Sequence, residues 1–473
     1  MNGLILLIVL LLVLTMLVVM TYYLRGIEAE QQAVLEESDA IVDEERLAGI
    51  IGSQGFVYTA IVMTSIGLLA SVYWMLKGTV WEGHLMEWLN LVVRLMHITF
   101  GIAWIGASFY FVFLENALNR TKDVREELAG NLWAVHGGGF YYLEKYKVAP
   151  KQIPKHLHWF KYEAYFTWLT GFSLLFVVYY FNAGAMLIDK NILDISPLMG
   201  TGIGVSSFFI AWLLYDILCK TVLKKSPLLF AILGLAILVG FAYFYSQVFS
   251  PRAAYIHFGA MLGSIMAGNV FFVIIPSQKA MVKAAKEGSF LDPQLGKNAG
   301  KRSLHNNYFT LPVLFVMISN HFPSTFGNKH PWLILTILSL GLAGVKHYLN
   351  LKEQGKLSYL VLPVSALVLL AAAFLTAPPK PGSCNETISF ATVNRIVQQR
   401  CVACHSAKPT DDVYTAAPNG VMFDTPDQII KKKDLIMQRV VVTKSMPQNN
   451  KTNITEEERD QIRCWITQGA SLK

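Results

Sequence analysis

Residues 357–382 read LSYLVLPVSALVLLAAAFLTAPPKPG, and this stretch decides the fold class. Its first part, residues 357–378, is almost entirely apolar and long enough for one helix to cross about 30 Å of hydrocarbon at about 1.5 Å per residue. After Thr376 the text changes to Ala-Pro-Pro-Lys-Pro-Gly, which indicates a stiff linker. The stretch therefore predicts that a membrane domain ends here and that a globular domain follows.

Nine more apolar runs of similar length precede this one, and the chain as a whole is 53% hydrophobic and only 15% charged. The expected spans lie at residues 3–24, 55–77, 88–116, 163–183, 199–220, 226–248, 253–277, 304–323, 330–349 and 357–378. We therefore expect a polytopic helix bundle of about ten spans. Its predicted parts are an extension at 1–87 with two spans and an acidic linker, an eight-span domain at 88–378, and a soluble domain at 379–473.

The soluble domain contains Cys401-Val-Ala-Cys404-His405. Two thiols at this spacing can bond to the two vinyl groups on one edge of a porphyrin while the next residue presents an imidazole to the iron. A zinc site would need two further ligands, and this part of the chain has no other histidine. The sequence therefore predicts one covalently bound haem c, and the fold class becomes all-α, with a C-terminal class-I-like cytochrome c domain.

Met446 is the expected sixth iron ligand, because it lies in a proline-stiffened loop and a thioether raises the reduction potential. Met422 and Met437 are interpreted as packing residues. Cys384 precedes the first expected helix of this domain and Cys464 lies in its last helix. In an oxidising compartment we expect a disulfide between them, with two buried thiols as the alternative.

Haem attachment at such a motif is completed on the outer face of a bacterial inner membrane, so the C-terminal domain is expected in the periplasm. Ten spans then place the N-terminus there too. The basic residues agree, since they concentrate in the four inner connections, between residues 120 and 155, 220 and 225, 279 and 302, and 346 and 356. Arg302 and Lys346 are counted among these loop charges. The net charge of +8 thus indicates orientation in a lipid bilayer and not nucleic-acid binding.

Ionisable residues within spans are costly and therefore functional candidates. Arg94 and His97 are three residues apart and share a helical face; His257, His305 and His321 lie in other spans. Three interpretations of these histidines remain open. They are hydrogen-bonded without a cofactor, or they are axial ligands of a b-type haem (His97, His257, His305 and His321) with Arg94 near a propionate, or they contact protons or substrate.

A long inner connection contains His136-Gly-Gly-Gly139-Phe-Tyr-Tyr. Glycines permit close approach of the backbone to a planar ligand, on which the aromatic rings could stack. The alternative is a turn within an interfacial aromatic belt. His136 joins the list of candidate catalytic residues.

Many short runs in the chain resemble the membrane-bound, cytochrome-c-linked urate oxidases, also called urate hydroxylases of the PuuD type. The resemblance extends from about residue 88 to the end, and residues 1–87, which we interpret as a docking or assembly element, have no counterpart. The matching runs are Val93–His97, Gly101–Tyr110, Val135–Tyr141, Trp159–Tyr165, Asn269–Pro276, His305–Pro312, Met317–His321, Cys401–Pro409 and Gly420–Pro426.

The resemblance implies an oxidoreductase of purine degradation. It would convert urate to 5-hydroxyisourate and pass electrons through haem c to a soluble cytochrome c or a terminal oxidase, without forming hydrogen peroxide. A site near Arg94 and His97 would lie in the outer half of the bilayer, where arginine pairs with the urate anion and histidine acts as base. A site near His136 would lie on the cytoplasmic side and would need a relay, for which b-type haem is the candidate.

Other classes of membrane protein fit the sequence less well. A haem-copper oxidase needs three clustered imidazoles and commonly an adjacent His-His pair, which this sequence lacks. A membrane-anchored electron-transfer cytochrome, fed by quinol or a b-type haem and without urate chemistry, is the main alternative. A transporter fused to a redox sensor is a third.

Overall fold

The computed structural model describes residues 79–472 except 122, 151, 155, 156, 357, 378–381, 412 and 415, together with residues 67, 71 and 74–76. The expected span at 3–24, most of the span at 55–77, and the acidic linker between them lie outside the described residues. The chain divides into two compact units, Met1–Leu85 and Met86–Lys473. The second unit is described below, and we call its residues 86–377 the bundle and residues 382–472 the tail.

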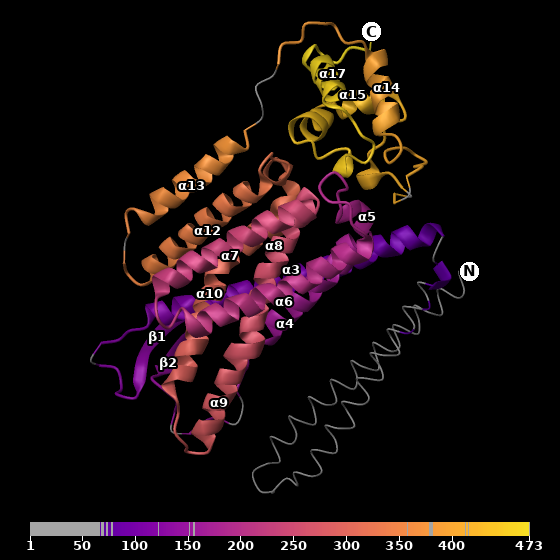
Figure 1. Cartoon of the computed structure of the whole chain (residues 1–473). Helices are drawn as coiled ribbons and strands as arrows, with labels where there is room; N and C mark the ends of the chain where they lie inside the picture. Colours follow the sequence, from indigo (N-terminus) through magenta and orange to yellow (C-terminus); the bar gives the residue numbers. More distant parts are fainter. Residues whose placement is uncertain are drawn as a thin grey trace. The chain divides into compact units, whose positions relative to one another are not determined.

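The bundle is mostly helical (Figure 1). Its elements are α3 (Val80–Ala117), β1 (Leu128–His136), β2 (Gly139–Tyr146), α4 (Tyr162–Leu174), η1 (Leu175–Tyr180), α5 (Ala183–Met186), α6 (Pro197–Thr221), α7 (Pro227–Val248), α8 (Pro251–Asn269), η2 (Val270–Ile274), α9 (Ile275–Lys286), α10 (Pro293–Ile318), η3 (Ser319–His321), α11 (Pro323–Phe326), α12 (Pro331–Glu353) and α13 (Val361–Leu375).

Five described helices are long and apolar enough to cross a membrane. They are Trp81–Ala117, Pro197–Thr221, Pro227–Val248, Pro251–Lys286 and Pro331–Glu353. The three other spans expected in the described part coincide with α4 and η1, with α10, and with the shorter α13. The prediction of a multi-pass membrane protein is confirmed to this extent.

Three neighbouring helices begin in the same way, with a Ser-Pro pair. Ser196, Ser226 and Ser250 are the N-caps of α6, α7 and α8, and each hydroxyl accepts a hydrogen bond from a backbone N–H in the first turn. Proline follows at the first helical position, where its missing N–H costs nothing and its fixed φ suits the helix. These caps explain why the three helices start close to the residues predicted from hydropathy.

The all-α prediction is wrong for one segment, because β1 and β2 form an antiparallel hairpin. Gly137 and Gly138 make the two-residue turn, with φ of 60° and 81°. Two positive φ angles are what the favoured tight hairpin turn requires, and the flanking valine and aromatic residues favour strands. The glycine run that suggested close approach to a ligand is therefore a hairpin turn, as in the alternative interpretation.

The core of the bundle surrounds α8, which packs against α6, α7 and α10, while α10 also packs against α12 (Figure 1). Tyr255, Met261 and Leu262 of α8 are almost completely buried. The helix continues through the π-helical turn η2 into α9, so residues 251–286 form one long rod.

The tail is a compact set of short helices: α14 (Phe390–Arg400), η4 (Pro418–Gly420), α15 (Pro426–Lys431), α16 (Lys433–Ile436), η5 (Met437–Val442), η6 (Gln448–Asn450) and α17 (Glu456–Thr467). Val393 and Ile396 of α14 share a buried cluster with Ile462 and Trp465 of α17.

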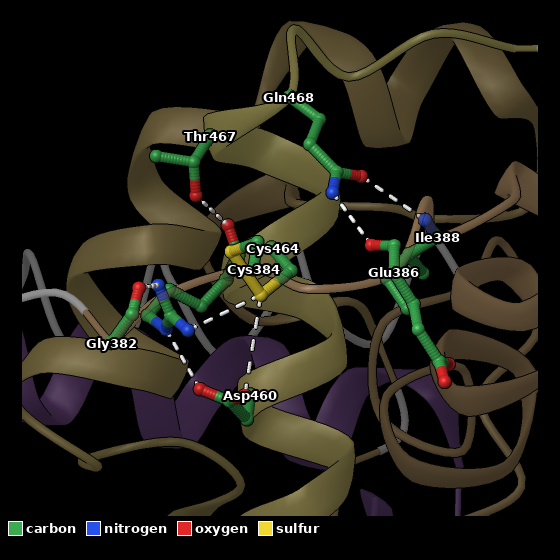
Figure 2. The surroundings of a disulfide bond; sticks show 9 residues. Gly382, Cys384, Glu386, Ile388, Asp460, Cys464, Thr467 and Gln468 are labelled. Atoms are coloured by element: carbon green, nitrogen blue, oxygen red, sulfur yellow. Dashed lines mark hydrogen bonds and ion pairs between the residues drawn. A yellow bond between two sulfur atoms is a disulfide. The ribbon is translucent and has the colours of Figure 1, made fainter.

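Cys384 and Cys464 form a disulfide, which is the pair expected from the sequence (Figure 2). Beside it, the Gln468 amide accepts a hydrogen bond from Ile388 N–H and donates one to the Glu386 carbonyl. The segment before α14 is thereby fixed to the last helix.

Candidate functional site

His97 connects two helices. Its Nδ1 lies 3.0 Å from the Thr167 carbonyl oxygen and 3.2 Å from Thr170 Oγ1, both on α4. The ring sits close against Gly171, since a Cβ added there would lie 2.8 Å from the imidazole Cε1. Arg94, one turn earlier, is exposed and donates to the Asn90 side chain at 2.9 Å. His97 thus has a clear packing role at the α3–α4 contact.

The structure does not bring His136 to this pair. It is exposed at the end of β1, and the hairpin is fixed to the C-terminal end of α3 by an ion pair between Lys145 and Glu115 and by a backbone bridge between Asn119 and Asn131. His97 lies 20 residues before Ala117 on α3, which is roughly 30 Å at 1.5 Å per residue. The three predicted catalytic residues therefore do not form one site.

His257 is completely buried on α8. Its Nδ1 lies 2.8 Å from the Ala253 carbonyl oxygen and its Nε2 lies 3.0 Å from the Tyr180 hydroxyl. The aromatic rings of Tyr179, Phe208, Tyr245 and Phe249 surround the imidazole. Both ring nitrogens are engaged with protein atoms, as in the interpretation without a cofactor.

His321 is exposed at the end of η3, whereas His305 lies in a polar network between helices. His305 Nδ1 lies 2.7 Å from the Tyr215 hydroxyl of α6, and its ring stacks on Phe230 of α7. The Asn269 amide donates to the same hydroxyl at 3.1 Å. Hence the four predicted b-type haem ligands occupy four different surroundings in the bundle.

A buried ion pair lies at the centre of this network. Arg302 Nη2 of α10 and Asp216 Oδ1 of α6 are 2.5 Å apart, and both side chains are almost fully buried. Arg302 Nη1 also donates to Asn269 Oδ1 at 3.0 Å, and Lys220 Nζ lies 2.6 Å from Asp216 Oδ2. Each buried charge has more than one partner, so the network joins α6, α8 and α10 without an unpaired ion.

A second polar cluster lies between α10, α12 and α3. Lys346 of α12 is completely buried, and its ammonium nitrogen lies 3.5 Å from the centre of the Phe109 ring. Asn350 is one turn further along α12 and is also buried. Asn307 of α10 reaches α3, where its amide lies 3.4 Å from Ser108 Oγ. In contrast to the first cluster, several polar atoms here have no protein partner within the described residues.

Four consecutive residues of α10 connect these clusters. His305 contacts Tyr215 of α6, Asn306 accepts a hydrogen bond from Asn269 of α8, Asn307 contacts α3, and the Tyr308 hydroxyl lies 2.6 Å from His347 Nδ1 of α12. Successive helical residues point about 100° apart, so a run of four contacts neighbours on every side. α10 is therefore the central element of the polar interior.

In the tail, the turn after α14 carries both cysteines of the motif and His405. The N–H groups of Cys404 and His405 bond to the Cys401 carbonyl. His405 Nδ1 lies 2.9 Å from the Val421 carbonyl oxygen, an acceptor only, so Nδ1 carries the proton and Nε2 keeps its lone pair. Met446 packs on the buried cluster of the tail, and its carbonyl accepts a hydrogen bond from Arg459. His405 therefore keeps free the nitrogen that an imidazole ligand would offer to the iron of a haem c.

The loop after Met446 contacts the bundle. The Asn449 amide donates to the carbonyls of Ala185 at 2.8 Å and Ile188 at 3.0 Å, and the Gln448 amide donates to Ala185 at 3.1 Å. The Tyr414 hydroxyl in turn donates to Gln448 Oε1 at 2.5 Å. The tail thus rests on the bundle at α5 through the loop that carries the expected thioether ligand.

Two carboxylates stabilise the tail near these elements. Although burial by itself raises the pKa of the Asp411 carboxyl, hydrogen bonds from Lys451 and from backbone N–H groups hold it below its usual value. The pKa of Glu458 is also lowered, because its hydrogen bonds and ion pair with Arg400 outweigh burial. Both groups are therefore ionised where the tail is folded at neutral pH.

A comparison with protein families finds a match to the family described as Urate oxidase N-terminal, over residues 83–377. The chain belongs to this family. The match supports a urate-related function and an oxidoreductase, in agreement with the resemblance noted from the sequence. Neither a curated protein nor a solved structure matches the chain.

The Urate oxidase N-terminal match ends at residue 377, where the bundle ends. Both polar clusters lie within it, whereas Cys401, Cys404, His405 and Met446 lie beyond it. The family match therefore covers the bundle, and the role of the tail has to be argued from its own residues.

The buried charged and amide side chains of this Urate oxidase N-terminal domain were not predicted from the sequence. Arg302 and Lys346 were counted as loop charges, but they are buried in α10 and α12. Asp216 was overlooked, although an acidic residue within the expected span 199–220 is a signal that can be read from sequence. Asn307 and Asn350 carry no charge, so hydropathy alone does not distinguish them from other polar residues of the helices.

Proposed function

We propose that the chain is a membrane urate oxidase that converts urate to 5-hydroxyisourate in the bundle and passes the electrons to a haem c in the tail. Cys401 and Cys404 would hold this haem covalently, and His405 and Met446 would be the iron ligands. When bound, the haem supplies a one-electron acceptor that is re-oxidised by a soluble cytochrome c or a terminal oxidase. The expected location is a bacterial inner membrane, with the tail in the periplasm.

The reaction balances without oxygen as a reactant. Urate and one water give 5-hydroxyisourate, two protons and two electrons; the new bond joins the water oxygen to a ring carbon. The bundle has to bind an anionic purine, position a water and accept its proton. Since one haem c takes one electron at a time, the tail has to be re-oxidised twice in each turnover, or a second carrier has to hold one electron.

The observation that carries the proposal is the position of the tail on the Urate oxidase N-terminal domain. The loop after Met446 rests on α5 through the Asn449 amide, and α5 adjoins the start of α8, where Ser250 N–H bonds to the Leu187 carbonyl. The aromatic side chains around His257 lie less than two turns further along α8. The loop that follows the candidate ligand Met446 therefore contacts the family domain, which supports electron transfer from the bundle to the tail.

Anaerobic spectroscopy of the purified protein tests this proposal. Urate added to the oxidised protein should reduce the c-haem absorption bands, and water labelled with ¹⁸O should place its label in the product. The double variant Cys401→Ser with Cys404→Ser should lose the covalent haem and the urate-dependent signal. If quinol reduces the haem while urate leaves its spectrum unchanged, the chain is instead a membrane-anchored electron-transfer cytochrome.

A pyridine haemochrome assay of the same preparation counts b-type against c-type haem. One haem c and no haem b would mean that His97, His257, His305 and His321 are not haem ligands. A haem b in addition would identify a second carrier in the bundle.

A further inference from the structure

The polar cluster at Lys346 gathers several buried polar atoms that have no hydrogen-bond partner within the described residues. Within the described residues, eight buried side-chain nitrogen and oxygen atoms have no hydrogen-bond partner, and four of them belong to this cluster. They are Lys346 Nζ, both amide atoms of Asn350, and Asn307 Oδ1. All three side chains are at most 3% exposed.

Such atoms are costly, because a buried donor or acceptor without a partner forfeits its hydrogen bonds to water. The cost is largest for a charged ammonium group. Arg302 and Asp216, in the same bundle, are fully provided with partners. The cluster at Lys346 is thus a specific local arrangement with unused hydrogen-bonding capacity.

The donors and acceptors that lack a partner indicate what kind of ligand would bind them. Lys346 offers a positive charge and N–H donors, Asn350 offers both an amide donor and a carbonyl acceptor, and Asn307 offers an acceptor. The Lys346 ammonium nitrogen lies over the face of the Phe109 ring, 3.5 Å from its centre, and this contact leaves its N–H groups without a hydrogen-bond acceptor. A planar anion that carries both carbonyl oxygens and ring N–H groups can provide partners for all of them.

We propose that Lys346, Asn350 and Asn307 form the binding site for the urate anion. This inference rests on the proposed function, and it assigns the substrate to the contact between α10, α12 and α3. Lys346 pairs with the negative charge, while the two amides recognise the edge that carries carbonyl and N–H groups. The predicted residues Arg94, His97 and His136 lie outside this site.

The site is deep in the bundle. Lys346 is 15 residues after Pro331 on α12, which is roughly 22 Å at 1.5 Å per residue. The carbonyl of Pro331 accepts a hydrogen bond from Tyr255 of α8, close to the end of the bundle on which the tail rests. Electrons therefore have to travel a comparable length to the tail.

Binding of urate without turnover tests the site. The full-length protein is kept reduced with ascorbate under argon, so that urate is not consumed, and ¹⁴C-urate binding is measured by equilibrium dialysis. We expect Lys346→Met to weaken binding at least tenfold and the matched variant Lys352→Met, which changes an exposed lysine of the same helix, to bind like wild type. Unchanged urate binding by Lys346→Met overturns the inference.

The Asn350→Leu variant separates a ligand-binding role from a structural one. Leucine replaces an amide without protein partners, so the melting temperature of the urate-free protein should stay the same or rise, while the rise that urate causes in wild type should disappear. A fall in the urate-free melting temperature, a failure to fold, or a retained response to urate contradicts the inference. If Lys346→Met does not fold, this variant decides.

The two proposals fail in distinguishable ways. If urate binds and reduces the wild-type protein but all cluster variants bind urate normally, the site is elsewhere and the proposed function stands. If the wild-type protein neither binds urate nor is reduced by it, the proposed function itself is wrong.

Discussion

Replacing Asp216 by leucine should be among the most destabilising single changes in the bundle. The carboxylate lies 2.5 Å from Arg302 and 2.6 Å from Lys220. Without it, Arg302 stays buried beside the uncharged side chains of Asn269 and Tyr215. Two charges 4 Å apart at an effective dielectric constant of about 20 attract by about 4 kcal/mol, and breaking buried pairs costs about 3–5 kcal/mol. We expect a loss of this size in the free energy of unfolding.

Two further variants assign the cost to the uncompensated arginine. Lys220 is 67% exposed, so Lys220→Met should cost less than about 1 kcal/mol. In the double variant Asp216→Leu with Arg302→Met, both charges are gone, and most of the stability should return, because apolar replacement of a whole buried pair is often neutral.

The measurement is reversible unfolding in mixed micelles of dodecyl maltoside and sodium dodecyl sulfate, followed by tryptophan fluorescence. The reasoning is refuted if Asp216→Leu costs no more than Lys220→Met. It is also refuted if the double variant is as unstable as the single one.

Three other predictions concern the tail. Replacing Cys384 and Cys464 together by serine opens a cross-link over 80 residues, and chain entropy predicts a loss on the order of 4 kcal/mol, measured by thermal unfolding with and without reductant. The pKa of Glu458 is lowered in the folded state, so its ionised carboxylate stabilises the tail fully above the ordinary pKa of about 4.3, and this stabilisation is lost as pH falls through the folded-state pKa. Glu458→Gln should therefore make the melting temperature of the tail less sensitive to pH in that acidic range. An unchanged pH profile would contradict this role of Glu458. Asn449→Gly retains a backbone that needs positive φ but removes two hydrogen bonds to the bundle, so urate-dependent haem reduction should slow by about tenfold while reduction by ascorbate does not change, and equal slowing of both rates would show a defect in the tail itself.

Hydropathy predicted the helices of the bundle well, because a span needs only length and apolar composition. The first residues of three helices were predictable for a second reason, since Ser226-Pro227 and the two similar pairs are local capping signals. The hairpin was not predicted, although Gly137-Gly138 between aromatic runs is a turn signal. Because the segment connects two membrane spans, an interfacial or ligand-binding loop was expected there instead.

The candidate site was much less predictable. Histidines within spans were interpreted as candidate ligands, but His257 is hydrogen-bonded within an aromatic core. Lys346 lies near the end of the expected span 330–349, where a lysine normally reaches water, and only the packing of α10 and α3 against α12 shows that it does not. Whether a buried polar atom has a partner depends on three helices far apart in sequence, and no local pattern encodes it.

The run His305–Tyr308 has a consequence for how this domain can vary. Because each of its four residues contacts a different neighbour, substitutions can alter one contact at a time. Insertion of a single residue just before the run would instead rotate it by about 100° relative to the first half of α10. Every polar side chain would then meet the wrong neighbour at once. Homologous chains should therefore tolerate changes of residue type along α10 far better than changes in its length.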